Sequence, residues 1–395
     1  MLQKCHIRFI GLLLLTSCVQ PFEFEGDRYE QLLVVDGLLT DQMVQHTVTL
    51  GFTRPVDGDT ILPVTGAEVM VLTDGVVILD YFEESPGFYR SNTAFQGITG
   101  QPYQLRIETS DDKIYESRPS TLLTVPPVDD LTFRYAELPS EELERNEPGI
   151  QFFLEADPGA NGAGEFYRFD WSETAQVRVP FPSNWAFDTP CTPDECSWFL
   201  RDTRVSVCYE TEISNGLTLG TTSFSVSNRL NEVPLRFVSL ETDKLRNRYS
   251  LEASMYAIDE EAYQYYSRLK EVNESGGSLF DNQQGAVIGN LVSVSDPDEP
   301  VLGYFEVSGV SHRREFFDPS DYGPLYSVPP FRFACRGGLV VITTTPDSIG
   351  YYLSLRPGYQ IINISNVPPE ATLGPRSCTD CSWYAPTAKP EFWED

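Results

Sequence analysis

The cysteines are the residues whose type and spacing point most directly to chemistry. Two pairs are close in sequence, Cys191 with Cys196 and Cys378 with Cys381, while Cys208 and Cys335 stand alone. Thiols in such patterns form disulfides, bind zinc or carry out redox exchange. The compartment decides among these chemistries, and the N-terminus indicates the compartment.

The N-terminus has the order of a secretory signal. Lys4 and Arg8 precede or flank an apolar run from Phe9 to Leu15, and the small residues Thr16 and Ser17 follow it. The run is too short to span a bilayer as a helix, which needs about twenty residues, but it suits an export signal. We therefore expect export and removal of residues 1–17.

The four residues Leu15-Thr16-Ser17-Cys18 resemble the bacterial lipobox, in which the cysteine is acylated and the chain is cut just before it. The resemblance implies a palmitate-bearing lipoprotein whose anchor is Cys18, with residues 18–31 as a tether. Each buried CH₂ contributes ~0.8 kcal/mol, so two or more acyl chains anchor stably. The alternative is an ordinary secretory signal with a chance cysteine nearby.

In an exported chain, the remaining cysteines predict disulfides. The six candidates permit fifteen pairings, which the sequence leaves open: Cys191, Cys196, Cys208, Cys335, Cys378 and Cys381. Zinc is the alternative, with the two close pairs as ligands. A redox role for Cys378 and Cys381 is disfavoured because they lie in a Pro-rich tail without a βαβ pattern. We expect no metal and no cofactor.

The charge is strongly acidic, with 58 acidic and 28 basic residues and a net charge of −30. Loss of Lys4 and Arg8 with the signal makes it more negative. Such a chain repels nucleic acid and anionic headgroups at short range. Nucleic acid is therefore not an expected partner, and solubility at a cell surface is the interpretation we favour.

The patterning favours a mainly β fold. Apolar residues alternate at Val44, His46, Val48 and Leu50 and again at 103–107, with turn residues such as Asp74-Gly75 at roughly ten-residue spacing. This is typical of a small antiparallel sandwich. We predict an N-terminal Ig-like sandwich over 32–126, ending at a double proline, and a larger antiparallel β domain over 127–395.

One helix is predicted over about 259–273, crossing the second domain. Asp259 is a suitable N-cap, Glu260 and Glu261 favour the first turn, and an apolar stripe follows. The stripe is expected to pack on the sheet and consists of Ala262, Tyr265, Tyr266, Leu269 and Val272.

No catalytic constellation can be named from the sequence. After signal removal only His46 and His312 remain, and we interpret His312 as a surface histidine at a strand end. No nucleophile elbow, phosphate loop or dinucleotide fingerprint occurs. Acidic pairs are too common in this chain to single out a glycosidase pair, so we expect a non-enzyme.

Tryptophans are the binding candidates. Trp185 and Trp198 lie in a long, Pro-broken insertion that we expect disulfides to staple, and aromatics on a rigid loop suit ligand or partner capture. The alternative, that they fill the core beneath the insertion, is favoured for both. Trp171, Trp383 and Trp393 are assigned to packing.

Two resemblances extend these expectations. The string PVTGAEVMV and the glycines and tyrosines after it resemble transthyretin-like or carboxypeptidase-regulatory-like sandwiches. From residue 248 onward, RYSLEASMYAIDEEAYQYYSRL, the segment GGSLFDNQQGAVIGNLVSVSDPDEPVLGYFEVSGV and the tail CTDCSWYAPTAKPEFWED resemble uncharacterised Bacteroidota outer-membrane lipoproteins, often encoded beside TonB-dependent receptors.

This resemblance implies a lipid-anchored protein of the outer membrane, at the cell surface, that assists a TonB-dependent receptor in nutrient uptake. Its ligand would be a small molecule, a peptide or a glycan. The alternative is a structural, assembly or adhesion factor that holds protein partners, and a third hypothesis is an undetected hydrolase. A cleft with clustered carboxylates of raised pKa would favour the hydrolase.

Overall fold

The computed structural model describes most of the chain after the N-terminal segment. The described residues are 31–53, 62–140, 144–158, 164–183, 185–187, 198–200, 205–223, 229–275, 287–335, 340–343, 353, 358–366 and 369–394. The predicted lipidation site Cys18 and the cysteines Cys191 and Cys196 lie outside these residues.

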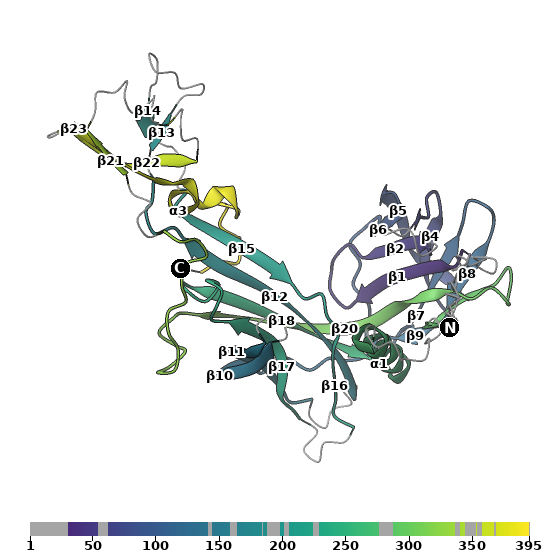
Figure 1. The fold of residues 1–395 in the computed structure, drawn as a ribbon. Helices are drawn as coiled ribbons and strands as arrows, with labels where there is room; N and C mark the ends of the chain where they lie inside the picture. The colour runs from purple at the N-terminus through teal and green to yellow at the C-terminus, as the bar shows by residue number, and fades with distance from the viewer. Residues whose placement is uncertain are drawn as a thin grey trace, which may run out of the picture.

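The first half of the chain forms an antiparallel β-sandwich, as predicted (Figure 1). Its strands are β1 (Leu33–Thr40), β2 (Thr47–Phe52), β3 (Leu62–Pro63), β4 (Glu68–Thr73), β5 (Val76–Ser85), β6 (Phe88–Ser91), β7 (Pro102–Glu108), β8 (Ile114–Ser117) and β9 (Ser120–Thr121). Alternate residues face one core, which includes Leu33, Val35, Leu50, Tyr89, Leu105 and Tyr115. The turn at Asp74-Gly75 joins β4 to β5, with φ positive at both residues, which suits a tight hairpin.

The second half is also β-rich, which confirms the predicted fold class. Its longest strands are β12 (Phe166–Arg178), β18 (Tyr249–Ile258) and β20 (Leu302–Phe317), flanked by β15 (Val207–Ile213) and β16 (Thr218–Thr221). A three-stranded antiparallel sheet covers them and consists of β10 (Asp130–Ser140), β11 (Arg145–Ala156) and β17 (Leu230–Ser239). An aromatic core lies between, where Phe152 stacks on Tyr249 with ring centroids 5.3 Å apart.

The two halves share one strand. The first part of β20 pairs in parallel with β1, and the second part pairs antiparallel with β18, so one continuous sheet runs through the molecule (Figure 1). The short strand β19 (Leu291–Ser293) likewise returns to pair with β8. The parallel β1–β20 pair departs from the purely antiparallel arrangement that the alternation predicted, because alternation carries no information about strand direction.

Gly303 allows β1 and β20 to approach each other. Its φ is +90°, and a Cβ atom there would lie 1.8 Å from the carbonyl oxygen of Val35. Only glycine tolerates both the backbone conformation and the contact.

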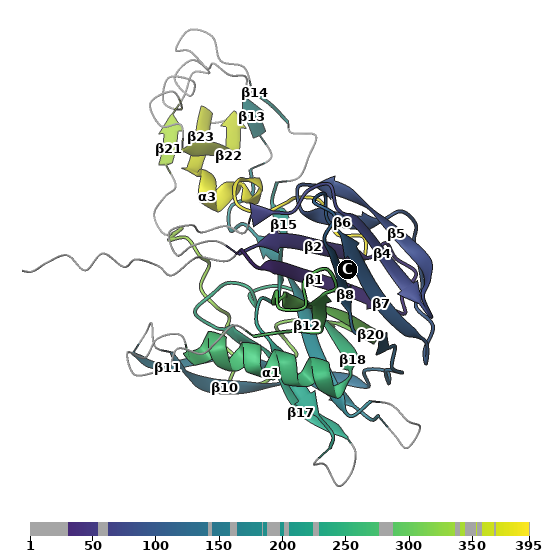
Figure 2. The same ribbon diagram turned by 90° about the vertical axis from the view of Figure 1, so that its right-hand side faces the viewer.

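The predicted helix forms as α1 (Glu260–Ser275) and runs across the sheet that contains β12 and β18 (Figure 2). Asp259 caps it: one carboxylate oxygen accepts from the Ala262 backbone N–H at 2.8 Å, and the other accepts from the Ser120 hydroxyl at 2.9 Å. Ala262 of α1 is buried, and Tyr265 stacks on Tyr304 of β20. The packing predicted for the stripe is therefore confirmed for Ala262, Tyr265 and Tyr266.

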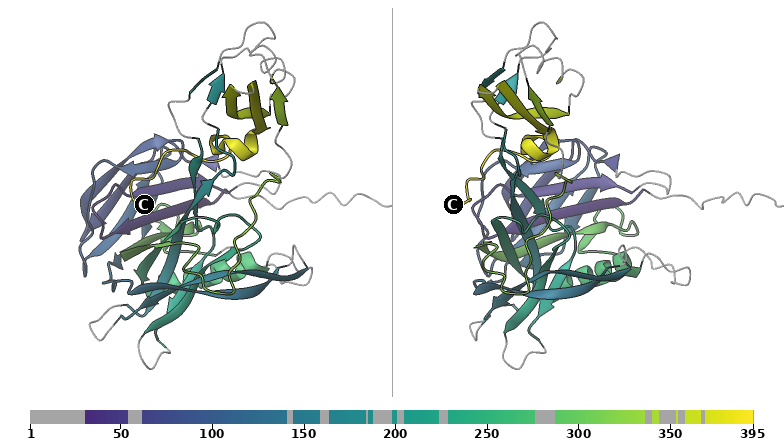
Figure 3. Two further views of the ribbon diagram at one scale, coloured as in Figure 1. Left: turned by 90° about the vertical axis from the view of Figure 1, so that its left-hand side faces the viewer. Right: turned by 60° about the vertical axis from the view of Figure 1, so that its left-hand side comes forward.

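A small module stands apart from the sandwich and α1 at the far end of β12 and β15 (Figure 3). It contains β13 (Trp185–Phe187), β14 (Trp198–Leu200), β21 (Val340–Thr343), β22 (Tyr359–Asn366), β23 (Pro369–Pro375), the short helix α3 (Arg376–Thr379) and the 3₁₀ turn η1 (Cys381–Trp383). Within the described ranges, no helix is long and apolar enough to cross a bilayer.

Candidate functional site

Two disulfides connect the small module to the rest of the chain. Cys208 of β15 is bonded to Cys381, with Cα atoms 5.9 Å apart, and Cys335 is bonded to Cys378, also at 5.9 Å. The prediction of disulfides is thus confirmed for these four cysteines. The CxxC pair is divided between two different partners, so its sulfurs are not available as a zinc pair.

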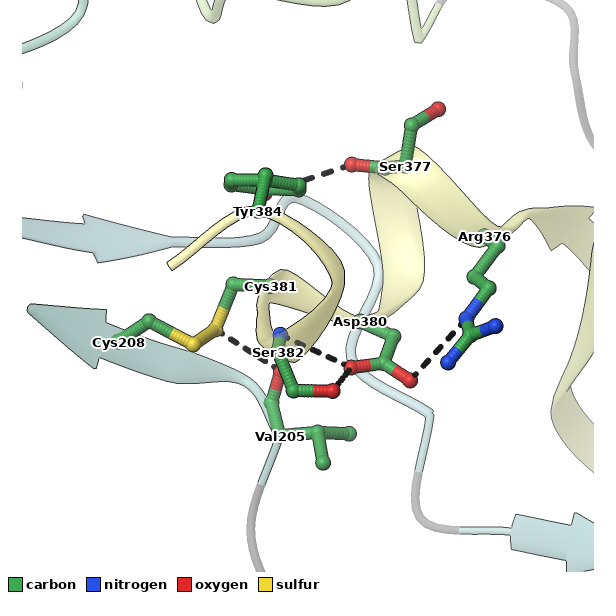
Figure 4. The surroundings of a disulfide bond; sticks show 8 residues. All are labelled: Val205, Cys208, Arg376, Ser377, Asp380, Cys381, Ser382 and Tyr384. Atoms are coloured by element: carbon green, nitrogen blue, oxygen red, sulfur yellow. Dashed lines mark hydrogen bonds and ion pairs between the residues drawn. A yellow bond between two sulfur atoms is a disulfide. The ribbon is translucent and has the colours of Figure 1, made fainter. Parts of the chain in front are cut away.

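The turn that holds Cys381 is stabilised by Asp380 (Figure 4). The buried Asp380 carboxylate accepts from the Ser382 backbone N–H at 3.0 Å and lies 3.6 Å from the Arg376 guanidinium. The Cys381 backbone N–H donates to the Val205 carbonyl at 2.9 Å. These contacts fix Cys381 against the strand that carries Cys208, and no group of three metal-binding side chains occurs in the described ranges.

Of the two tryptophan candidates, only Trp185 has a described side chain. Trp185 is half-buried against a small core of the module that includes Leu353, Ile361 and Leu373. The backbone of Trp198 pairs with Phe187 in β13, and its side chain lies outside the described atoms. Packing beneath the insertion, the favoured alternative, therefore applies to Trp185.

The other three tryptophans differ in how far they are buried. Trp393 is buried and meets Tyr209 edge to face, and Trp171 packs at the edge of the main core under the Arg236 guanidinium, as assigned. Trp383 is 61% exposed, so its assignment to packing was wrong. It follows the Cys381 turn, which directs it outward.

An extended concave surface follows the outer face of β1 and β2. Three adjoining hollows of about 260, 350 and 180 Å³ lie along it. The first and second share Asp36 and Thr49, and the second and third share Leu38 and Thr47. Because successive side chains of a strand face opposite sides, these residues all lie on the face opposite the sandwich core. We call this continuous surface the β1 groove.

The groove is long. It follows β1 from Val34 to Thr40, which at 3.3 Å per residue corresponds to about 20 Å. It crosses the joint between the two halves, because β20, which pairs with β1, and β18, which pairs with β20, contribute Glu306 and Tyr256 to its lining. Such a length fits an extended ligand rather than a single small ring.

A buried ion pair forms the wall of the middle hollow. Arg168 of β12 donates from Nε and Nη2 to the two carboxylate oxygens of Glu306, at 2.9 and 3.2 Å. Glu306 also accepts from the Tyr266 hydroxyl at 2.6 Å and the Ser308 hydroxyl at 2.8 Å. Burial alone would lower the pKa of Arg168, but the charges of Glu306 and then Asp170 outweigh it and raise that pKa. Both oxygens of Glu306 therefore accept hydrogen bonds from side chains around the hollow.

Asp36 differs from Glu306 because its carboxylate accepts no side-chain or backbone hydrogen bond within the described part of the chain. It is open to solvent in the groove, where Arg168 is already engaged by Glu306 and Asp170. The surrounding groove walls still partly desolvate Asp36 and so raise its pKa, the negative charge of Glu306 raises it further, and Arg168 partly offsets both. A carboxylate in this state is suited to accept hydrogen bonds from a ligand.

Both histidines that follow the signal segment line the third hollow. His46 is buried, its Nε2 donates to the Phe95 carbonyl at 2.9 Å, and burial lowers its pKa. His312 is exposed, and its Nδ1 lies 2.7 Å from the Ser254 hydroxyl oxygen. His312 is a surface residue as predicted, but it lies within β20 rather than at a strand end. One neutral and one exposed imidazole therefore mark this end of the groove.

Sequence reasoning missed Asp36, Arg168 and Glu306. The available signal was Asp36 itself, a charged residue within the apolar run LVVDGLL. The next residue, Gly37, lies so close to Phe305 that a Cβ atom would be 2.9 Å from the ring. A charged residue beside a closely packed glycine in an apolar strand indicates a functional position. The other two residues of the site, Arg168 and Glu306, are about 130 and 270 residues away in sequence.

The fold and the groove define a β-sandwich protein with a polar groove across the joint of its two halves. The chain belongs to the family described as "Domain of unknown function (DUF4249)", whose model matches residues 19–314. All residues that line the β1 groove fall within this segment, whereas Cys335, Cys378 and Cys381 follow it. No curated protein matches the chain.

Proposed function

We propose that this chain is a lipid-anchored, non-catalytic binding protein that holds an extended polar ligand in the β1 groove. The observation that carries the proposal is the continuous groove with the Asp36 carboxylate at its centre, which accepts no hydrogen bond from any described residue. Hydroxyl groups of Thr47 and Thr49 line the same surface and can donate or accept. A glycan, with many hydroxyl donors for Asp36, suits this lining better than an apolar compound.

The anchor supports a location at the outer membrane. Fifteen residues separate Cys18 from Leu33, where β1 begins, so the groove can lie at most about 50 Å from an acyl anchor at Cys18. Anchoring raises the effective concentration of the protein beside a membrane partner. The resemblance to lipoproteins encoded beside TonB-dependent receptors makes such a receptor the proposed partner, which would take up the ligand.

Binding is favoured over hydrolysis because, among the described residues that line the groove, only the Asp36 carboxylate is free. A glycoside hydrolase needs two carboxyl groups that act on opposite sides of the scissile bond. Glu306, the nearest second carboxylate, is engaged by Arg168, Tyr266 and Ser308 and is almost completely buried. Asp36 therefore has the raised pKa that the hydrolase hypothesis requires, but not the partner.

A protein-binding role is the second proposal, and it is supported by exposed apolar residues in the small module. Phe199 and Leu200 of β14 are 50% and 62% exposed, and adjacent exposed apolar side chains suit contact with a protein partner. This surface lies on a different element from the β1 groove, so the two proposals can be separated by mutation.

The test combines purification with a groove-filling variant. The native lipoprotein is purified from detergent-solubilised outer membrane, and co-purification of a TonB-dependent barrel is expected. A panel of soluble oligosaccharides and peptides is then titrated against the protein. Thr49→Tyr, which fills the centre of the groove, is expected to abolish binding, while Thr121→Tyr on exposed β9 is expected to retain it.

Two results would count against the proposal. If Thr49→Tyr binds the panel as well as the parent protein, the groove is not the site. If the barrel co-purifies with the parent protein but is lost from a Phe199→Ser/Leu200→Ser variant, the protein-binding role is favoured. Cys18→Ser tests the anchor separately, because this variant is expected to leave the membrane fraction.

A further inference from the structure

A further hollow, separate from the β1 groove and about 400 Å³ in volume, lies at the end of the central sheet that is remote from the sandwich. It is lined by Gln176 and Arg178 at the end of β12, by Arg246, Asn247 and Arg248 before β18, and by Asp318 after β20. Three guanidinium groups thus surround one hollow, in a chain with about twice as many acidic as basic residues. We call this the arginine hollow.

The arginines are positioned largely by neutral groups. Arg178 donates from Nε to the side-chain oxygen of the buried Gln176 at 2.7 Å, and Arg246 donates from Nη1 to the Pro329 carbonyl at 2.5 Å. Neither forms an ion pair with a carboxylate in the described part of the chain. Most other described arginines do, as Arg332 does with Glu210 and Asp243.

Arg248 is also short of acceptors. Its Nη1 donates to Asp318 at 2.5 Å, and its guanidinium lies 5.0 Å from the centre of the Phe316 ring. Its Nε is buried and has no hydrogen-bond partner among the described residues. A buried charged donor without an acceptor is costly and indicates a missing partner.

The acidic groups near the hollow do not neutralise it. Asp318 is shared with Arg248, and Asp321 accepts from the Asp318 backbone N–H at 2.7 Å within the loop after β20. Asp243 and Glu210 are both held by Arg332. Three positive charges against the single lining carboxylate leave an excess of positive charge in the hollow.

We propose that the arginine hollow binds a phosphate group. Guanidinium groups donate in a planar fork that matches oxyanions. Three of them, one from β12 and two from the stretch before β18, fit a tetrahedral group with several oxygens better than a carboxylate with two. The strongly negative chain disfavours approach to an anionic membrane, so the phosphate is carried by a soluble molecule rather than by a lipid headgroup.

The test uses the full-length lipoprotein in a neutral detergent and inorganic phosphate as the probe. Isothermal titration at a fixed salt concentration is expected to detect saturable binding. When the titration is repeated at higher chloride concentrations, the binding is expected to weaken. Arg178→Gln, which changes an exposed side chain, is expected to weaken binding about tenfold, and Arg178→Gln/Arg246→Gln is expected to abolish it. Arg134→Gln, which removes an exposed arginine paired with Glu232 elsewhere, is the matched control and is expected to bind normally.

Circular dichroism confirms that each variant is folded before it is used. Absence of saturable phosphate binding to the parent protein overturns the proposal, as does equal binding by Arg178→Gln and Arg134→Gln. Vesicles with and without phosphatidylglycerol form the second arm. Arginine-dependent binding to the anionic vesicles, with none to inorganic phosphate, overturns the soluble-ligand assignment.

Discussion

Replacement of Glu173 by glutamine is expected to destabilise the protein strongly at neutral pH. Glu173 of β12 is 1% exposed and lies where Arg236, Lys244 and Tyr249 converge. Arg236 Nε and Nη2 donate to its two oxygens at 2.8 and 2.9 Å, while Lys244 Nζ and the Tyr249 hydroxyl each donate at 2.5 Å. Glutamine keeps the size of the side chain but removes the charge and one acceptor.

The magnitude follows from the pKa of Glu173. Burial would raise it, but the hydrogen bonds and charge of Arg236, with Lys244 and Tyr249, outweigh burial and lower it from 4.5 to about 2. Because each pKa unit corresponds to about 1.4 kcal/mol, the carboxylate contributes about 3 kcal/mol to the free energy of unfolding at neutral pH. Loss of one partner from a buried ion pair typically costs a similar amount, ~3–5 kcal/mol.

The pH dependence has a definite sign. A carboxyl group whose pKa is lower in the folded state stabilises the fold above its unfolded pKa, and this contribution is lost as the pH falls from about 4.5 toward 2. The difference between the parent protein and Glu173→Gln should therefore be full at pH 7 and shrink as the pH approaches 2.

Urea unfolding followed by circular dichroism measures this difference at several pH values. The control is Glu84→Gln, which removes a half-exposed partner of Arg90 and is expected to cost less than about 1 kcal/mol. If Glu173→Gln costs no more than the control at pH 7, or if its cost is unchanged at pH 2, the buried network does not stabilise the fold as argued.

Three further predictions concern the disulfide, the strand joint and the groove. Cys208→Ser/Cys381→Ser opens a 173-residue loop and should lower the free energy of unfolding by up to about 5 kcal/mol in urea titrations without reductant; an unchanged value would contradict the loop-closure argument. Gly303→Ala should cost about 3 kcal/mol or more in the same assay, because its Cβ meets a β1 carbonyl oxygen at a positive φ; a cost below about 1 kcal/mol would contradict that contact. Asp36→Asn should slightly raise the melting temperature at pH 7, because a carboxyl group with a raised pKa destabilises the fold above that pKa. The control, Asp80→Asn at an exposed position of β5, should leave the melting temperature unchanged. A lower melting temperature for Asp36→Asn would show that Asp36 stabilises the fold.

Local features were predictable from the sequence where neighbouring residues determine them. The start of α1 follows from Asp259 and the acidic first turn, and the β4–β5 hairpin follows from Asp74 and Gly75. Disulfide chemistry followed from the even number of cysteines in a chain that we expected to be exported. The lipid anchor at Cys18 stays a prediction.

Features that depend on contacts between distant segments were not predictable. The pairing of Cys378 and Cys381 with different partners arises because the turn between them points the two sulfurs in different directions, toward β15 and toward Cys335. The groove residues come from β1, β12, β20 and α1, and only the β1–β20 pairing brings them together. A strand pattern cannot indicate a partner some 270 residues away.

The shared strand β20 has a consequence for how the protein reaches its native state. The edge of β1 that faces away from β2 has unpaired backbone N–H and C=O groups until residues 302–308 pair with it. An open strand edge of this kind invites association with other chains. The sandwich therefore cannot be finished from its own sequence alone, and a chain truncated before residue 300 should be prone to aggregate even though every strand from β1 to β9 is present. The two halves therefore complete each other, and the groove forms only when β20 has paired with β1.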